Sequence, residues 1–336
     1  MVRAKDIASQ IGVSKETVSA VLTGHWRERR ICSQTKDRVL ATAHQLGYVP
    51  HHAARRLARA RPESRETSFD QVGLIHLLGP GHGLDPVCLA MMSGAEPELS
   101  KLHACLTFVR VSTHADWQKV ERLTRAGGVD GWLVYGRVDD DIENRLSLGK
   151  LPFVILGDHR CTRPVHCVTV DNFAVGRQAV EHLAALGHRR IAFLGSNLRY
   201  VYEQETLAGF RATLRELDLD DDDRLIGNLS SWTDGAEAPL VDWLRDADPM
   251  PSAVFASEYD WAPWVHLMLK EAGIEVPKQI SVLGYESASM ATQRENFTRI
   301  ELPMNEVGRR GALSLHGIVM KPGPASSNTG QIVLVR

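Results

Sequence analysis

Residues 4–22 of this chain read AKDIASQIGVSKETVSAVL, and this stretch decides the fold of the N-terminal part. Apolar side chains recur at helical spacing on both sides of Gly12: Ile7, Ala8 and Ile11 before it, and Val18, Val21 and Leu22 after it. Gly12 suits a sharp turn because glycine adopts a positive φ at little cost, and the Ser14 hydroxyl is a suitable N-cap for the second helix. The pattern predicts a helix-turn-helix.

The charge of the chain is divided unequally. The first sixty residues hold 11 Lys and Arg against 4 Asp and Glu, a balance of +7, whereas the remainder has a balance of −9. A basic helical module beside an acidic body indicates that the module binds a polyanion. The start of the second helix of a DNA-binding helix-turn-helix enters the major groove, so we expect double-stranded DNA as the partner. The alternative is a solvated helical hairpin without a function, which the basic charge disfavours.

A third helix completes the module. It begins near Cys32 and Ser33, ends at Gly47, and its apolar residues at helical spacing are Ile31, Val39, Leu40, Ala43 and Leu46. We therefore assign residues 1–49 to an all-α headpiece. Residues 50–58 favour a hinge helix that is too short to be stable alone and should fold only against a partner, and residues 59–71 form a charged linker.

Residues 72–336 alternate short apolar runs with helical stretches. The runs lie at 72–78, 131–135, 153–156, 191–194, 253–255 and 280–283, and helical stretches lie at 175–186 and 261–272. Buried strands that alternate with helices predict a parallel sheet covered on both faces. A segment of about 265 residues is longer than a single hydrophobic core usually supports, so we expect an α/β body of two doubly wound lobes. Ligands in such folds bind beyond the C-terminal ends of the strands.

The remaining sequence signals indicate a cytoplasmic protein without catalytic activity. The start of the chain lacks the apolar core of a signal peptide, and no window is long and apolar enough to span a membrane. The five cysteines form no CxxC pair, so we expect buried thiols rather than disulfides or zinc ligands. No nucleophile elbow, P-loop, HExxH or dinucleotide fingerprint occurs, and the histidines are not grouped at ligand spacing. We expect no enzyme, no metal site and no cofactor.

With these elements in place, the sequence resembles the LacI/GalR family of bacterial transcription regulators. The headpiece motifs that carry the resemblance are Lys5-Asp6-Ile7-Ala8, Gly12-Val13-Ser14, Thr17-Val18-Ser19, Thr35, Val39, Leu46-Gly47-Tyr48-Val49-Pro50 and Ala54-Arg55-Arg56-Leu57. The body motifs, in the family's order, are Asp171-Asn172 with Gly176, residues 186–192, Leu207-Ala208-Gly209-Phe210, residues 251–256, Val276-Pro277 and residues 280–285. The resemblance implies a homodimer whose body is periplasmic-binding-protein-like, with an effector cleft between its lobes and chain crossings near Val168, Ala291 and Ala325.

The residues expected to contact DNA in the headpiece are Ser14, Lys15, Glu16, Thr17, Ser19 and Ala20. Lys15 can donate to guanine and Glu16 can accept from cytosine, while the hydroxyl groups can bond phosphates or base edges. The resemblance implies an arginine at position 20, where Ala20 offers only a methyl contact. It also implies that Arg55 and Leu57 belong to a hinge helix that pairs with its counterpart, and that Leu57 wedges into the minor groove.

Two further features of the headpiece depart from the family. The loop at 23–30 is longer than usual, and we expect its arginines Arg27, Arg29 and Arg30 to contact phosphates. Cys32 stands where the family often has a capping serine, so we expect Ser33 to cap the third helix instead.

The residues expected to bind an effector follow strand ends or family positions, and they are His82, Asp85, Asp158, Thr206, Trp232, Tyr259 and Glu286. The resemblance implies an arginine before Leu207, an Asn-Asp pair after Ser257 and an aspartate after Tyr285. These departures indicate either an effector unlike the family's usual hexoses or a cleft that senses no small molecule. A sugar or sugar derivative is the first choice, and Trp232 is equally compatible with a place in the core.

We therefore expect a sequence-specific transcription regulator, a repressor rather than an activator, that binds a palindromic operator as a homodimer. A small molecule, for which a carbohydrate is the first choice, would modulate its affinity from the cleft between the lobes. An activator and a regulator without an effector stay open. A free small-molecule binding protein would explain the two lobes but not the basic headpiece.

Overall fold

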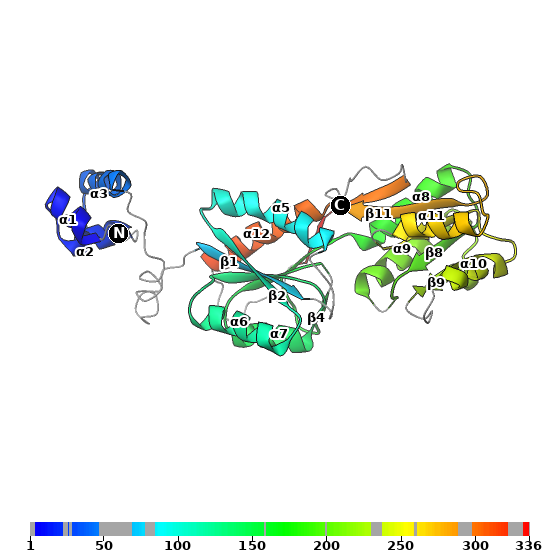
Figure 1. Ribbon diagram of the computed structural model, residues 1–336, viewed down its shortest axis with the longest axis horizontal. Helices are drawn as coiled ribbons and strands as arrows, with labels where there is room; N and C mark the ends of the chain where they lie inside the picture. Colours follow the sequence, from blue (N-terminus) through cyan, green and yellow to red (C-terminus); the bar gives the residue numbers. More distant parts are fainter. Residues whose placement is uncertain are drawn as a thin grey trace. The chain divides into compact units, whose positions relative to one another are not determined.

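The structure is a computed structural model that describes residues 4–22, 26, 29–46, 69–77, 85–157, 159–198, 200–229, 237–258, 261–287, 298–321 and 332–335. The predicted hinge helix at 50–58 lies outside these residues, as does most of the predicted linker. The chain divides into an N-terminal unit and a large body. Figure 1 draws both units, and each is described by itself below.

The headpiece contains the three predicted helices. They are α1 (Ala4–Ile11), α2 (Lys15–Leu22) and α3 (Ser33–Gln45). Their shared core is formed by Ile7, Ala8, Val18, Val21, Val39 and Ala43. Gly12 has a φ of +72°, as the turn requires, and the Arg38 guanidinium of α3 donates to the Ile11 carbonyl at 3.0 Å. This contact satisfies the C-terminus of α1 and ties it to α3.

The first lobe is a six-stranded parallel sheet in the spatial order β13-β7-β5-β3-β1-β2. Its strands are β1 (Gln71–Leu77), β2 (Cys105–Val111), β3 (Gly131–Tyr135), β5 (Phe153–Leu156), β7 (Cys167–Val170) and β13 (Ile332–Val335), with a short pair formed by β4 (Val138–Asp139) and β6 (His159–Arg160). Helices α5 (Pro86–Lys101) and α12 (Met304–Met320) cover one face of the sheet, and α6 (His114–Arg125) and α7 (Asp140–Leu148) cover the other (Figure 1). Alternation along β1 places Leu74 in the core beneath α5 and Ile75 in the core beneath α6.

The second lobe repeats this doubly wound plan with five parallel strands in the order β12-β11-β10-β8-β9. The strands are β8 (Ile191–Gly195), β9 (Ile226–Asn228), β10 (Ala253–Ala256), β11 (Ser281–Ser287) and β12 (Thr298–Leu302), and the helices are α8 (Asn172–Ala185), α9 (Val201–Glu216), α10 (Glu237–Asp246) and α11 (Trp261–Glu271). Phe193 of β8 packs edge-on against Phe210 of α9, with ring centroids 5.3 Å apart. The neighbouring Leu194 packs into the core beneath α10 and α11.

The chain crosses between the lobes at two described places. The first crossing follows β7, next to the predicted position at Val168, where Asp171 caps α8. The second comes at Pro303, between β12 of the second lobe and α12 of the first, so the expectation of a crossing near Ala291 is wrong. A third crossing near Ala325 is also not supported, because α12 and β13, on either side of residues 322–331, both belong to the first lobe.

Two smaller expectations need correction. Phe69 is buried in the first-lobe core, and the Asp130 carboxylate accepts from the amides of Asp70 and Gln71 at 2.7 and 2.9 Å, so the body begins before residue 72. All five cysteines are free thiols, but Cys32 and Cys105 are exposed rather than buried.

Among the helices that the structure describes, none is long and apolar enough to cross a membrane. No group of metal-ligating side chains occurs among those described residues either.

Candidate functional site

The start of α2 presents the predicted DNA-contacting residues. The Ser14 hydroxyl accepts from the Thr17 amide at 3.0 Å, which confirms Ser14 as the N-cap, and its oxygen also lies 3.0 Å from the Thr17 hydroxyl. Both hydroxyls are therefore used within the cap. Lys15, Glu16 and Ser19 are exposed, whereas Thr17 is only half-exposed. Among these residues, the groups most available to base edges are the ammonium of Lys15 and the carboxylate of Glu16.

Ala20 is placed differently from the expectation. Its side chain is 8% exposed, so its methyl group is covered within the headpiece and is not presented to a duplex. The family position was inferred from the sequence register, which fixes the place of a residue along the helix but not how the neighbouring segments cover it. Arg55 and Leu57 lie outside the described residues.

Cys32, rather than Ser33, occupies the cap of α3. The helix begins at Ser33, and the Cys32 sulfur lies 3.2 Å from the Thr35 hydroxyl oxygen. Hydrogen bonding from the Thr35 side chain and backbone amide lowers the pKa of the exposed Cys32 thiol. Close by in sequence, Arg29 and Arg30 are exposed and remain candidates for phosphate contacts, while Arg27 lies outside the described residues.

The first lobe has a polar cluster at the C-terminal ends of its central strands. The Asp85 carboxylate caps α5 by accepting from the Cys88 amide at 2.7 Å, pairs with His76 Nε2 at 3.0 Å and accepts from the Tyr135 hydroxyl at 3.4 Å. Burial alone would raise the pKa of Asp85, but the hydrogen bonds from His76 and Cys88 outweigh it and lower that pKa. His76 is 1% exposed, and its Nδ1 atom has no hydrogen-bond partner among the described residues.

Asp85 both holds elements of the first lobe together and stays accessible to a ligand. Three of its hydrogen-bonding positions hold α5, β1 and β3 together, and its side chain is still 35% exposed. Asp85 can therefore accept from a ligand while its orientation stays fixed by the protein. Sequence reasoning selected Asp85 because it follows a strand end, but it missed His76 and Tyr135, which lie inside strands that read as uniformly buried.

The second lobe carries a matching cluster at the ends of β8 and β10. The Ser196 hydroxyl donates to Glu258 Oε2 at 2.8 Å and also contacts Glu203 Oε1, and the Tyr202 hydroxyl donates to Glu258 Oε2 at 2.8 Å. Glu203 is completely buried. The sequence does not single out Tyr202 or Glu203, because a polar residue in the first turn of a helix is typical of a solvated surface, and a lone serine after a strand, such as Ser196, is equally ordinary.

Thr206 does not belong to this cluster, and its assignment to the effector site is wrong in this structure. It is 2% exposed, and its hydroxyl donates to the Tyr202 carbonyl one helical turn earlier at 2.8 Å. Its backbone faces α8, where Gly176 allows close approach of the two helices.

Glu286 lies in the last part of β11, and His82, Asp158, Trp232 and Tyr259 lie outside the described residues.

The two clusters share a topological position, since both lie beyond the C-terminal ends of parallel strands. The segments that follow the strands of the two sheets come close to each other. The Arg137 guanidinium, just after β3, lies 6.0 Å from the ring centre of Tyr200, just before α9. We call the groups formed by His76, Asp85 and Tyr135 and by Ser196, Tyr202, Glu203 and Glu258 the first-lobe face and the second-lobe face.

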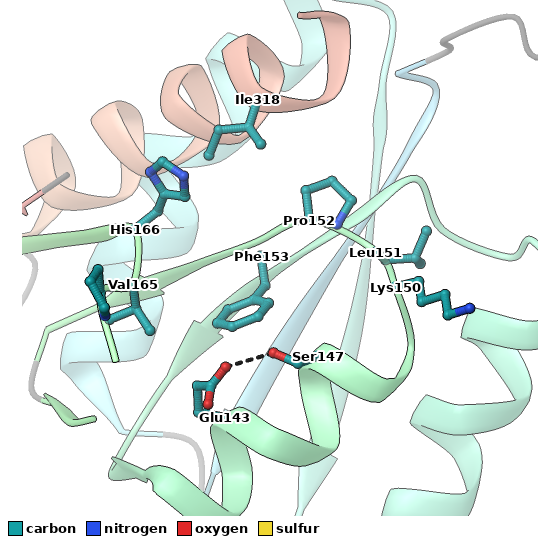
Figure 2. A pocket seen from close by; sticks show the side chains of 10 residues that line it. Glu143, Ser147, Lys150, Leu151, Pro152, Phe153, Val165, His166 and Ile318 are labelled. Carbon is teal, nitrogen blue, oxygen red and sulfur yellow. Dashed lines mark hydrogen bonds between the residues drawn. The ribbon is translucent and has the colours of Figure 1, made fainter. Parts of the chain in front are cut away.

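A separate cavity of about 230 Å³ opens at the other end of the first sheet, beside the N-terminal ends of β5 and β7 (Figure 2). Its polar floor is the buried Glu143 carboxylate, which accepts from the Ser147 hydroxyl at 2.6 Å and from Arg163. Phe153, Val165 and Ile318 supply apolar walls. Because the charge of Glu143 is already compensated by Arg163, this cavity lacks the open acceptor that the strand-end faces offer.

Comparison with known proteins gives two matching family models. A model described as bacterial regulatory proteins, lacI family, matches residues 4–51, and a periplasmic binding protein-like domain matches residues 180–333. The HTH-type transcriptional regulator AscG of Escherichia coli (strain K12) is 27% identical over 305 residues, which cover 90% of this chain and 87% of AscG.

Two solved structures share the fold over almost the whole chain. A complex of the transcriptional regulator CelR with cellobiose has a TM-score of 0.67 at 23% identity, covering 100% of this chain and 97% of that chain. A lac repressor dimer bound to operator and the anti-inducer ONPF has a TM-score of 0.73 at 21% identity, covering 99% of this chain and 96% of that chain.

Proposed function

The chain belongs to the lacI family of bacterial regulatory proteins, and from this premise we propose that it represses transcription by binding a palindromic operator as a homodimer in the cytoplasm. The observation that carries the proposal is the start of α2, where Ser14 fixes the helix and leaves the side chains of Lys15 and Glu16 exposed. One headpiece of this size makes few base contacts, and a twofold dimer doubles them on a twofold site.

The same proposal assigns effector binding to the two strand-end faces. Their exposed acceptors, above all the Asp85 carboxylate, suit a ligand that supplies hydroxyl donors, and a carbohydrate has that chemistry. The CelR relative, whose structure holds cellobiose, has the same fold. Polar groups on both faces favour a sensing cleft over a regulator without an effector. The family consists of regulators, and we propose no catalytic activity.

Replacing Lys15 by alanine is expected to weaken binding to a specific duplex by about 1–3 kcal/mol per half-site, because the variant loses a bidentate contact to guanine in each half-site of the dimer. Fluorescence anisotropy with a duplex recovered from a random-sequence library measures the change. The matched control is Lys101→Ala, which removes an exposed lysine of α5 in the body. Equal affinities for both variants would contradict the placement of α2 in the major groove.

A further inference from the structure

Glu203 occupies an unusual environment for a carboxyl group. Its side chain is 0% exposed, and its Oε1 atom accepts from the amides of Ser196 and Asn197 at 2.9 and 3.2 Å. Its Oε2 atom is buried and has no hydrogen-bond partner among the residues that the structure describes. That oxygen lies against Gly195, where a Cβ atom would come within 2.4 Å of it. Among the described residues, no lysine, arginine or histidine forms an ion pair with Glu203.

The hydrogen-bond network also lacks one proton. Three contacts join hydroxyl groups to the two carboxyl groups most closely: Ser196 to Glu203, Ser196 to Glu258 and Tyr202 to Glu258. The hydroxyls of Ser196 and Tyr202 bring only two protons. If both carboxyl groups were ionised, one of these contacts would be a pair of oxygens without a hydrogen between them. A proton on Glu203 completes the network, since it can donate to Ser196, which then donates to Glu258.

Electrostatics favours the same location for the proton. Burial raises the pKa of Glu203, and the nearby negative charge of Glu258 raises it further, against the lowering effect of the Ser196 and Asn197 contacts. The pKa of Tyr202 is also raised by burial and by both glutamates, so this hydroxyl stays protonated. Glu258 is partly exposed and accepts from the hydroxyl groups of Ser196 and Tyr202.

We propose that Glu203 is a protonated carboxylic acid at neutral pH, so that the two glutamates of the second-lobe face together carry one negative charge, on Glu258. This inference rests on the proposed function only where it concerns effector binding. A neutral ligand with hydroxyl donors would then meet a single ionised acceptor on this face. Loss of the Glu203 proton would place a second charge inside the cluster and weaken binding of such a ligand as pH rises.

The other charged and titratable groups near Glu203 do not replace this proton. On α9, Glu205 faces away and accepts from Asn172 of α8 at 2.9 Å. Arg137 of the first lobe lies over the ring of Tyr200, and within the described part of the chain Tyr202 is the other titratable group in contact with the carboxyl. The proton on Glu203 is therefore controlled chiefly by burial and by Glu258.

Infrared spectroscopy of the full chain tests the proposal without DNA or an effector. We expect the carbonyl-stretch band of a protonated carboxylic acid at about pH 7, where ordinary glutamates are ionised, and we expect Glu203→Gln to remove it. The control Glu205→Gln should leave the band in place. Absence of such a band in the unsubstituted protein, or its persistence in Glu203→Gln, would overturn the proposal.

Thermal unfolding supplies a second readout. A carboxyl whose pKa is raised by folding binds more protons in the folded state, so its contribution to stability declines as pH rises above the unfolded pKa. The Tm of the unsubstituted protein should therefore fall relative to that of Glu203→Gln as pH rises above about 5. A constant difference would contradict the inference.

If Glu203→Gln fails to fold, Glu258→Gln provides the test instead. Removing the neighbouring charge should allow the infrared band of Glu203 to persist to higher pH, and an unchanged band would overturn the coupling. Because none of these measurements involves DNA, their failure would leave the proposed repressor function standing, and loss of DNA binding would leave this inference standing.

Discussion

Operator binding is expected to weaken about 250-fold when the salt concentration rises fourfold, which corresponds to a log–log slope of about −4. The reason is the balance of +7 in the first sixty residues, present in both headpieces of the proposed dimer. Each phosphate that a cation neutralises releases counterions, so a slope of −4 requires about four or five phosphate contacts per dimer. Fluorescence anisotropy with a specific duplex at several salt concentrations gives the slope directly.

Variants identify which cations produce the slope. Arg29→Ala should reduce its magnitude by about 2, since each dimer would lose two phosphate contacts. Lys101→Ala, which removes a positive charge of equal size from the body, should leave the slope unchanged. A response to salt that is flat in the unsubstituted protein would contradict DNA binding through the headpiece.

Gly176→Ala is expected to reduce the free energy of unfolding of the body by about 3 kcal/mol, because α8 and α9 could no longer approach so closely. A Cβ atom at Gly176 would lie 1.9 Å from the Thr206 carbonyl oxygen and 2.7 Å from the Phe210 amide nitrogen. Gly209 is equally confined from the other side, with a Cβ 2.0 Å from the Phe173 carbonyl oxygen. Backbone atoms cannot move aside as a flexible side chain can, so the two helices would have to separate.

The matched control is Gly317→Ala in α12, where a Cβ atom would meet nothing within 4 Å. Alanine there should stabilise the protein by about 0.5–1 kcal/mol through its higher helix propensity. Urea unfolding of the two variants measures the opposite effects. Equal midpoints would mean that α8 and α9 are not in the contact described, which would also displace Tyr202 and Glu203 on α9.

The interior strands of the two described sheets could be predicted from the sequence, except β7, and the edge strands β2, β9, β12 and β13 could not. The runs that became β1, β3, β5, β8, β10 and β11 are continuously apolar because both of their faces are covered by helices. β2 and β12 lie at sheet edges and carry several exposed or half-buried side chains, polar ones among them, so neither reads as an apolar run. The missed strand β12 explains the misplaced crossing, because β12 belongs to the second sheet and α12 of the first lobe follows it after Pro303.

The candidate site was predictable only where a residue's role follows from local sequence. Ser14 and Gly12 act within a few residues of themselves, and the structure places both as expected. Glu203 depends on contacts with the end of β8 and with Glu258, which lies 55 positions further along the chain. Thr206 was assigned from the family register, but its smaller side chain bonds within its own helix and stays buried.

In the proposed function, the exposed start of α2 reads a twofold operator. Selection of binding sites from random-sequence DNA by the full chain tests it most directly, with Glu16→Ala examined in parallel. We expect an enriched site with two symmetric half-sites. The Glu16 variant should lose the preference at one equivalent position of each half-site, because it lacks the carboxylate that accepts from cytosine. No enriched sequence, an asymmetric site, or an identical site for both proteins would contradict it.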